Sequence, residues 1–212
     1  MGKMPNGILG PLIGSIGNVT GYMLNGEYVT RIKKRKITRF TQNQRGNQQR
    51  MAVLNEFFNF MGSFLKVGFG LAALGTTKNY HNLATAYNKK NAIKGEYPNV
   101  EIEYSKVLLS TGDLTEAQNP IVEAVTDGLK FSWDLLDVDG QNGQDQVMML
   151  AFGTVSKKVA YILYGPKRID GEAILPLEPK MMQEPLETYI SFVSPDRLQV
   201  ANSVYTGRVE PI

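Results

Sequence analysis

Cysteine is absent from this 212-residue sequence, and histidine occurs once, at His81. The lack of cysteine excludes disulfides, thiolate zinc sites, iron–sulfur clusters and cysteine nucleophiles. Because there is one histidine, any serine–histidine pair or histidine metal site would depend on a single ring. The sequence also lacks a P-loop, a G-x-S-x-G nucleophile elbow and an H-E-x-x-H zinc motif. No residues combine a nucleophile with a base and its orienting group, so we predict no catalytic residue, no cofactor and no enzymatic activity.

No segment has the pattern of a secretory signal peptide, because Pro5, Pro11 and several glycines interrupt the apolar run at the N-terminus. The cellular location is left open. One stretch resembles a membrane span, residues 57–74, in which only Lys66 is charged. Asn59, Lys66 and the helical spacing of the apolar residues argue against that interpretation, so we do not expect a membrane span.

Charge is divided unevenly along the chain. Residues 1–50 carry nine Lys or Arg and one acid, Glu27, whereas residues 51–212 carry fourteen Lys or Arg and nineteen acids. A basic N-terminal part with a balance of +8 therefore precedes an acidic body with a balance of −5. This division indicates either a polyanionic partner or contacts with acidic protein surface.

Glycines spaced three or four apart separate the apolar residues near the N-terminus. On a helix they would form a smooth stripe, but repeated glycine and Pro11 disfavour a helix. The alternative that we favour is an extended apolar arm that lies over a neighbouring surface. In either case the arm cannot bury itself. We therefore interpret its apolar residues as a possible assembly arm: Ile8, Leu9, Leu12, Ile13 and Ile16.

An Asn-Gly pair at positions 25 and 26 separates two alternating segments and predicts a β-hairpin with a two-residue turn. That turn places Met23 opposite Tyr28 and Val19 opposite Ile32.

The second strand of this hairpin continues into a run of basic residues. The run could hold a polyanion such as nucleic acid, or it could contact an acidic surface of another subunit. It could also be a solvated edge strand whose lysines prevent unwanted pairing. The residues are Arg31, Lys33, Lys34, Arg35, Lys36 and Arg39.

Residues 48–69 predict one helix with two apolar stripes, both of which need cover. The cover could come from the hairpin, from a C-terminal β domain or from a neighbouring subunit. A second helix over residues 78–93 follows a glycine-containing connection and is expected to form an antiparallel pair with the first.

Beyond residue 95 the pattern changes to short alternating segments separated by turn residues. Such a series is typical of an antiparallel sandwich, immunoglobulin-like or fibronectin-like. Trp133, in the clearest strand, is the expected core anchor. We predict an α+β chain with an arm and basic hairpin (1–40), a helical pair (41–95) and a β-sandwich (96–212). The candidate strands are residues 100–110, 121–125, 129–136, 146–152, 158–164, 172–177, 187–193 and 198–206.

Asp137, Asp139, Asn142 and Asp145 resemble oxygen ligands for calcium. The helix–loop–helix calcium pattern is not met, because Asn142 stands where glycine is required and Met148 where a bidentate glutamate is required. A hairpin loop rich in turn-forming residues explains these positions, so no metal is predicted. A calcium site in a sandwich loop remains the alternative.

Several stretches together resemble a family of uncharacterised proteins from Bacteroidota. They are NGILG and GSIGNVTGY near the N-terminus, YNKKNAIKGEYPNVEIEYSKVLLSTGDL at 87–114, FSW at 131–133, and ETYISFVS and VANSVYTG near the C-terminus. The resemblance spans nearly the whole chain. The sequence has Thr41-Gln42 where the family has a Thr-Pro pair, which leaves the start of the helix open. The family has no assigned catalytic residues, so the resemblance implies no particular function.

These observations predict a non-enzymatic structural protein that assembles with copies of itself, such as a subunit of a filament, a surface layer or a phage-like particle. The alternative is a binding module whose basic hairpin holds a polyanion such as nucleic acid. No small-molecule substrate is predicted.

Overall fold

The computed structural model describes residues 2–24, 26–34, 38–135 and 142–211. The chain divides into two compact units, unit 1 (Met1–Thr41) and unit 2 (Gln42–Ile212). Strands make up the regular structure of unit 1, and unit 2 combines helices with antiparallel sheets. The predicted α+β class is therefore confirmed.

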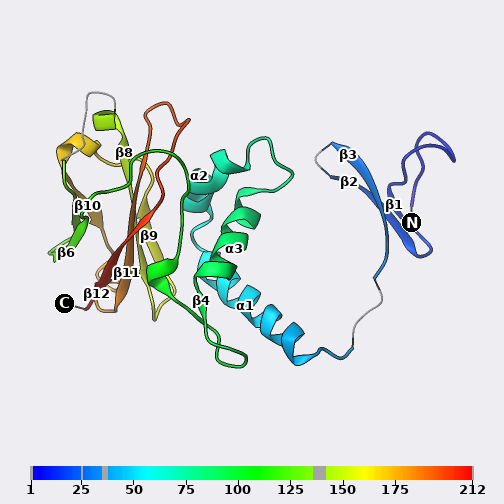
Figure 1. Ribbon diagram of the computed structural model, residues 1–212, viewed down its shortest axis with the longest axis horizontal. Coiled ribbons are helices and arrows are strands. Elements are labelled where there is room, and N and C mark those ends of the chain that lie inside the picture. The colour runs from blue at the N-terminus through cyan, green and yellow to red at the C-terminus, as the bar shows by residue number, and fades with distance from the viewer. Residues whose placement is uncertain (1, 25, 35–37, 136–141, 212) are drawn as a thin grey trace. The chain divides into compact units, whose positions relative to one another are not determined.

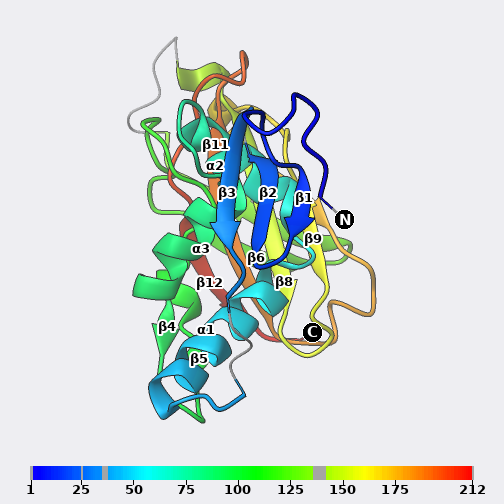
Figure 2. The same cartoon turned by 90° about the vertical axis from the view of Figure 1, so that its right-hand side faces the viewer.

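Unit 1 is a three-stranded antiparallel sheet with the strand order β1-β2-β3 (Figure 2). Strands β2 (Val19–Leu24) and β3 (Glu27–Ile32) form the predicted hairpin. Its register is the predicted one, since Met23 lies opposite Tyr28 and Val19 opposite Ile32.

The glycine-rich segment contains no helix in its described residues. Its last part forms β1 (Gly14–Ile16), which pairs with β2 of the same unit. The backbone of Leu12 also lies close to β2, because a Cβ atom at Gly21 would be 2.0 Å from the Leu12 carbonyl oxygen. Glycine at position 21 is thus required by the approach of a second backbone. The predicted extended conformation of the arm is therefore observed for β1. The pairing of β1 with the hairpin was not predicted.

Unit 2 begins with α1 (Gln42–Phe58), α2 (Gly62–Ala73) and α3 (Tyr80–Asn91). The prediction of one helix over residues 48–69 is wrong, because the chain turns between α1 and α2. Met61 precedes α2 with non-helical backbone angles, φ −113° and ψ 24°. Asn59 and Gly62 have low helix propensity, which favours a break at this point. Among the described residues, no helix is long and apolar enough to cross a membrane.

The strands of unit 2 form three antiparallel sheets. The smallest contains β4 (Ile93–Lys94) and β5 (Glu101–Ile102), and the other two have the orders β10-β7-β6 and β12-β11-β8-β9. Their bounds are β6 (Ile121–Val125), β7 (Gly128–Ser132), β8 (Gln146–Gly153), β9 (Val159–Ile162), β10 (Glu172–Pro176), β11 (Leu186–Val193) and β12 (Val204–Val209).

Three predicted strands differ from the structure, and one of them, predicted over residues 129–136, ends at Ser132. The other two differ more. The strand predicted over residues 100–110 ends with β5, and Tyr104–Lys106 form a short 3-10 helix. The strand predicted over residues 198–206 begins only at Val204. In the first of these two cases a side chain takes the place of a neighbouring strand, because the buried amide of Asn88 bonds both the N–H and the carbonyl oxygen of Leu108. A hydrophobic pattern does not reveal such pairing.

Three layers make up unit 2: the three-stranded sheet, the four-stranded sheet and the helices (Figure 1). The central strands of the middle layer, β8 and β11, are buried along their length except at the half-buried Gln146. Met149 and Ile190 belong to the core shared with the three-stranded sheet. Leu150 and Tyr189 belong to the core shared with the helices. The middle sheet therefore has two apolar faces, and each face has its own cover.

Candidate functional site

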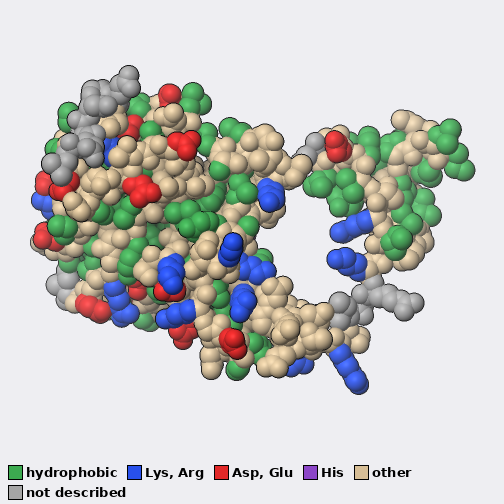
Figure 3. Space-filling model, in the orientation of Figure 1, with side chains coloured by type: hydrophobic (Ala, Val, Ile, Leu, Met, Phe, Trp, Pro, Cys, Tyr) green, Lys and Arg blue, Asp and Glu red, His purple; other side chains and the backbone are tan. Residues whose placement is uncertain are grey.

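Unit 1 has almost no interior. Among its described residues only Gly21 is buried, and hydrophobic side chains gather on its surface (Figure 3). Of the predicted arm residues, Ile8 is 87% exposed and Leu9 is 98% exposed, whereas Leu12 is half-buried. The other large exposed apolar side chains among the described residues of unit 1 are Ile13, Ile16, Met23, Leu24, Tyr28, Ile32 and Phe40. The structure thus brings the arm and the hairpin together in one unit with an open apolar surface.

The basic residues at the end of β3 and after it are exposed wherever the structure describes them, namely at Arg31, Lys33, Lys34 and Arg39. Arg35 and Lys36 lie outside the described residues. The guanidinium of Arg31 lies 5.3 Å from the ring centroid of Tyr22, and Nζ of Lys33 donates a hydrogen bond to the carbonyl oxygen of Gly17 at 3.1 Å. In the described part of the chain none of the four forms an ion pair. Their charge is available to an external anion.

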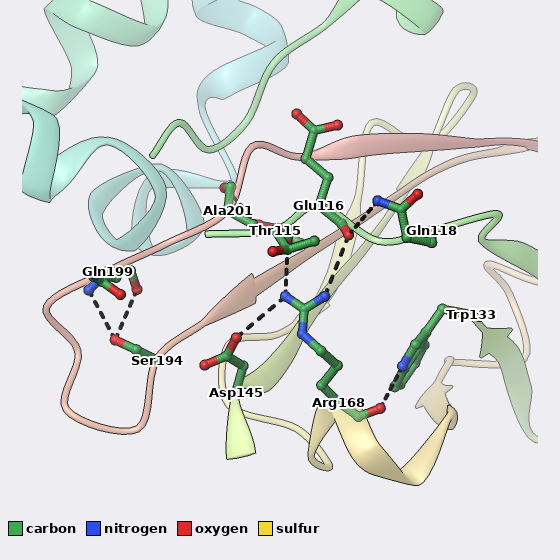
Figure 4. A network of polar contacts seen from close by, with 10 residues as sticks. Thr115, Glu116, Gln118, Trp133, Asp145, Arg168, Ser194, Gln199 and Ala201 are labelled. Atoms are coloured by element: carbon green, nitrogen blue, oxygen red, sulfur yellow. Dashed lines mark hydrogen bonds and ion pairs between the residues drawn. The ribbon is translucent and has the colours of Figure 1, made fainter. Parts of the chain in front are cut away.

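Asp145, a candidate calcium ligand, lies beside a buried cation (Figure 4). Its Oδ2 atom is 3.4 Å from Nη2 of Arg168, and both side chains are 4% exposed. Asn142 begins the short 3-10 helix Asn142–Gln144, and Asp137 and Asp139 lie outside the described residues. Among the residues that the structure places, no three His, Cys, Asp or Glu side chains form a group suited to a metal ion.

Arg168 holds several segments of unit 2 together. Its Nη2 atom donates to the carbonyl oxygen of Thr115 at 2.6 Å, and its guanidinium carbon lies 3.7 Å from the ring centroid of Phe192. Trp133 donates from Nε1 to the carbonyl oxygen of Arg168 at 2.7 Å and is itself buried, which confirms its predicted core position. Burial lowers the pKa of Arg168, and the adjacent Asp145 opposes this shift. The network is a structural one, enclosed by protein.

A cavity of about 440 Å³ opens between α1, the β4–β5 segment and the four-stranded sheet of unit 2. One wall is apolar and includes Phe57, Tyr104 and Phe152. Acidic and basic side chains complete the lining in equal number: Glu56, Glu101, Glu187, Lys94, Lys157 and Arg208. A cavity of this size, with an apolar wall and a few polar groups, has the properties of a small-molecule site.

Glu187 is the most deeply placed charged group of this cavity. It lies on β11, is 3% exposed, and accepts a hydrogen bond from the hydroxyl of Tyr205 at 2.5 Å. Burial, followed by the hydrogen bond to Glu187, raises the pKa of Tyr205. Burial is also the main cause of the raised pKa values of Tyr104 and Tyr189, and Glu187 adds to both. The carboxylate therefore influences three phenols around it.

The sequence alone does not indicate an important structural or functional role for Arg168 or Glu187. Arg168 follows a lysine in a turn-rich segment, and Glu187 is the second residue of a strand that is buried along its whole length. Position 187 carries a usable signal of a functional or structural role, because an acidic side chain inside a strand buried on both faces needs a polar partner. That signal depends on knowing that β11 is a central strand with a layer on each side.

Comparison with known proteins identifies one family. A model described as "Family of unknown function (DUF6266)" matches residues 11–207, from the segment before β1 into β12. No curated protein matches, and no solved structure matches. The predicted resemblance to an uncharacterised family is confirmed at that level. The match covers most of both units, and the chain therefore belongs to the family of unknown function DUF6266.

Proposed function

We propose that this protein is a non-enzymatic structural subunit that assembles with copies of itself through unit 1. The observation that carries the proposal is the open apolar surface of unit 1, in which Gly21 is the only buried residue among those described. A three-stranded sheet of this size needs an apolar face packed on something else to be stable. Because the chain has no cysteine, disulfides cannot take the place of that packing.

Charge supports a second copy as the covering partner. Residues 1–41 carry seven Lys or Arg and one acid, a balance of +6, whereas residues 42–212 carry sixteen and nineteen, a balance of −3. Unit 1 of one copy is therefore complementary in sign to unit 2 of another. A contact between two different surfaces repeats from copy to copy, and it produces rings or open arrays such as filaments, surface layers or phage-like particles.

We further infer that β6–β12 form a fibronectin-like sandwich that serves as the body of the subunit. The strand orders β10-β7-β6 and β12-β11-β8-β9 support this inference, since three strands face four across a shared core.

Assembly is tested by light scattering on the full chain over a range of concentrations. We expect the average mass to rise with concentration, and we expect Ile8→Ser with Leu9→Ser to weaken association by at least ~100-fold, since each buried aliphatic side chain contributes ~1.5–3 kcal/mol. Val155→Ser is the matched control because Val155 is 74% exposed in unit 2. A monomeric wild type at every concentration, or equal association by the double variant, rejects the proposal.

The second candidate is a polyanion-binding module, favoured by the exposed basic residues that lack ion pairs among the described residues. If it is correct, a labelled oligonucleotide binds with an affinity that falls steeply with salt. Lys33→Ala with Lys34→Ala should then reduce the slope of log K against log salt by ~1.4–1.8, measured by fluorescence anisotropy. Lys89→Ala with Lys90→Ala, an adjacent pair on α3, is the control with the same charge change. Absent or salt-independent binding removes this candidate.

A further inference from the structure

Glu187 is a buried carboxylate whose cross-strand neighbour on β12, Arg208, forms its ion pair with Glu210 instead. It is 3% exposed, and its one hydrogen bond in the described structure comes from the neutral hydroxyl of Tyr205. No ion pair among the described residues includes Glu187. A charge removed from water in this way is unfavourable unless a cation or further donors compensate it. The cavity beside Glu187 is the place from which such a cation can come.

Two of the three basic side chains that line the same cavity form ion pairs in the described structure. Lys94 lies 3.6 Å from Glu101, and Nε of Arg208 lies 2.8 Å from a carboxylate oxygen of Glu210. Lys157 places its ammonium 6.0 Å from the ring centroid of Phe152. Glu210 lies outside the cavity lining, whereas Glu101 belongs to it. Among the lining residues that form no ion pair in the described structure, two are acids, Glu56 and Glu187, and one is a base, Lys157, so this unpaired charge favours a positively charged ligand.

The apolar wall provides the other half of a binding site. The rings of Phe57 and Phe152 meet edge to face with centroids 4.8 Å apart, and Tyr104 lies 5.8 Å from Phe57 and 6.0 Å from Phe152. The three rings form one wall, and Tyr104 is its half-exposed member, since Phe57 and Phe152 are 2% and 1% exposed. Aromatic rings attract ammonium groups through their negative faces, and they also pack against apolar groups. The position of Lys157 near Phe152 shows that an ammonium is accommodated at this wall.

We propose that the cavity lined by Glu187, Phe57, Tyr104 and Phe152 binds a small amphipathic amine. The ammonium group lies at the carboxylate of Glu187, and the apolar group of the ligand packs against the three rings. The volume of about 440 Å³ suits a ligand of this size. This site lies within unit 2, and the inference does not depend on assembly through unit 1.

Isothermal titration calorimetry on the full chain tests the site with phenethylammonium as the probe. We expect saturable binding of this amine and no binding of 3-phenylpropionate, a ligand of similar shape and opposite charge. These two titrations use the wild-type protein and need no variant. Failure of the amine to bind, or equal binding of the anion, overturns the proposal.

Glu187→Gln assigns the binding to this carboxylate. Glutamine keeps an acceptor for Tyr205 but removes the charge, so amine affinity should fall by about 10- to 100-fold, the effect of losing a charge-assisted contact. Glu123→Gln is the matched control, because Glu123 is an exposed residue of β6 that does not line the cavity. We expect less than about a 3-fold change for this control. Equal effects of the two substitutions, or unchanged affinity in Glu187→Gln, place the amine elsewhere and overturn the proposal.

Discussion

Replacing Arg168 with methionine is expected to lower the free energy of unfolding by about 3–5 kcal/mol, because it leaves the buried carboxylate of Asp145 without its cation. The same change removes the donors to the carbonyl oxygens of Thr115 and Glu116 and the cation–π contact with Phe192. Methionine retains much of the apolar stem of arginine, so a cavity is not the main cause of the loss. Urea unfolding followed by far-ultraviolet circular dichroism measures it.

Arg197→Met is the matched control for this prediction. The guanidinium carbon of Arg197 lies 3.7 Å from the ring centroid of Tyr164, the same distance as in the buried pair, but Arg197 is exposed. We expect a loss of only ~0.5–1 kcal/mol. The double variant Arg168→Met with Asp145→Asn should recover part of the stability, since it removes the buried negative charge. Equal losses at the two arginines would contradict the role assigned to burial.

Local signals in the sequence were sufficient for the hairpin of unit 1. An Asn-Gly pair between alternating segments fixes both the turn and the register, and the observed pairing of Met23 with Tyr28 follows from it. Trp133 is similar, because alternation over residues 129–133 separates a buried face from a half-buried one. These features depend on neighbours that are close in the chain.

The layered body of unit 2 depended on distant contacts and was only partly predictable. The run VMMLAFG in β8 is continuously apolar, which is consistent with a strand covered on both faces, but a strand pattern does not identify the covering layers. The helical stripes of residues 48–69 suggested instead that the helix was the element between two layers. In the structure the four-stranded sheet has that position. The chain turns between Phe58 and Gly62, and both α1 and α2 contribute to the core on one face of the sheet.

The candidate sites show the same division. Composition alone identified the basic residues after β3 and the apolar arm, because exposed charge and unburied apolar residues are properties of short segments. Glu187 and Arg168 gain their importance from partners on other elements, Tyr205 and Asp145. One sequence without aligned relatives does not place those partners together. The cavity and the buried arginine network therefore required the three-dimensional structure.

Gly68→Ala and Gly70→Ala, two identical substitutions in α2, are expected to change stability in opposite directions. A Cβ atom at Gly68 would lie 2.3 Å from the carbonyl oxygen of Leu109 and 2.7 Å from Cβ of Ser110, so the segment crossing the helix would have to move. Overpacking of this kind costs ~1–3 kcal/mol. Apart from the neighbouring backbone of the helix itself, no atom of the described residues lies within 4 Å of the corresponding position at Gly70. Alanine there should stabilise the helix by ~0.5–1 kcal/mol.

The crossing segment cannot relieve the clash at Gly68 by a small shift, because it is bonded on both sides. Thr111 donates its N–H to the carbonyl oxygen of Gly68 at 2.9 Å. The hydroxyl oxygen of Ser110 lies 2.8 Å from the hydroxyl of Ser191 on β11 and 2.8 Å from the carbonyl oxygen of Ala201. Moving the segment away from α2 therefore breaks contacts that join the helices to the sheet. Urea unfolding of the two variants and of the wild type shows whether each substitution raises or lowers the free energy of unfolding. If both alanines stabilise the protein, the segment that crosses α2 can move away from Gly68 at little cost. The close approach of that backbone would then not be the reason for glycine at this position.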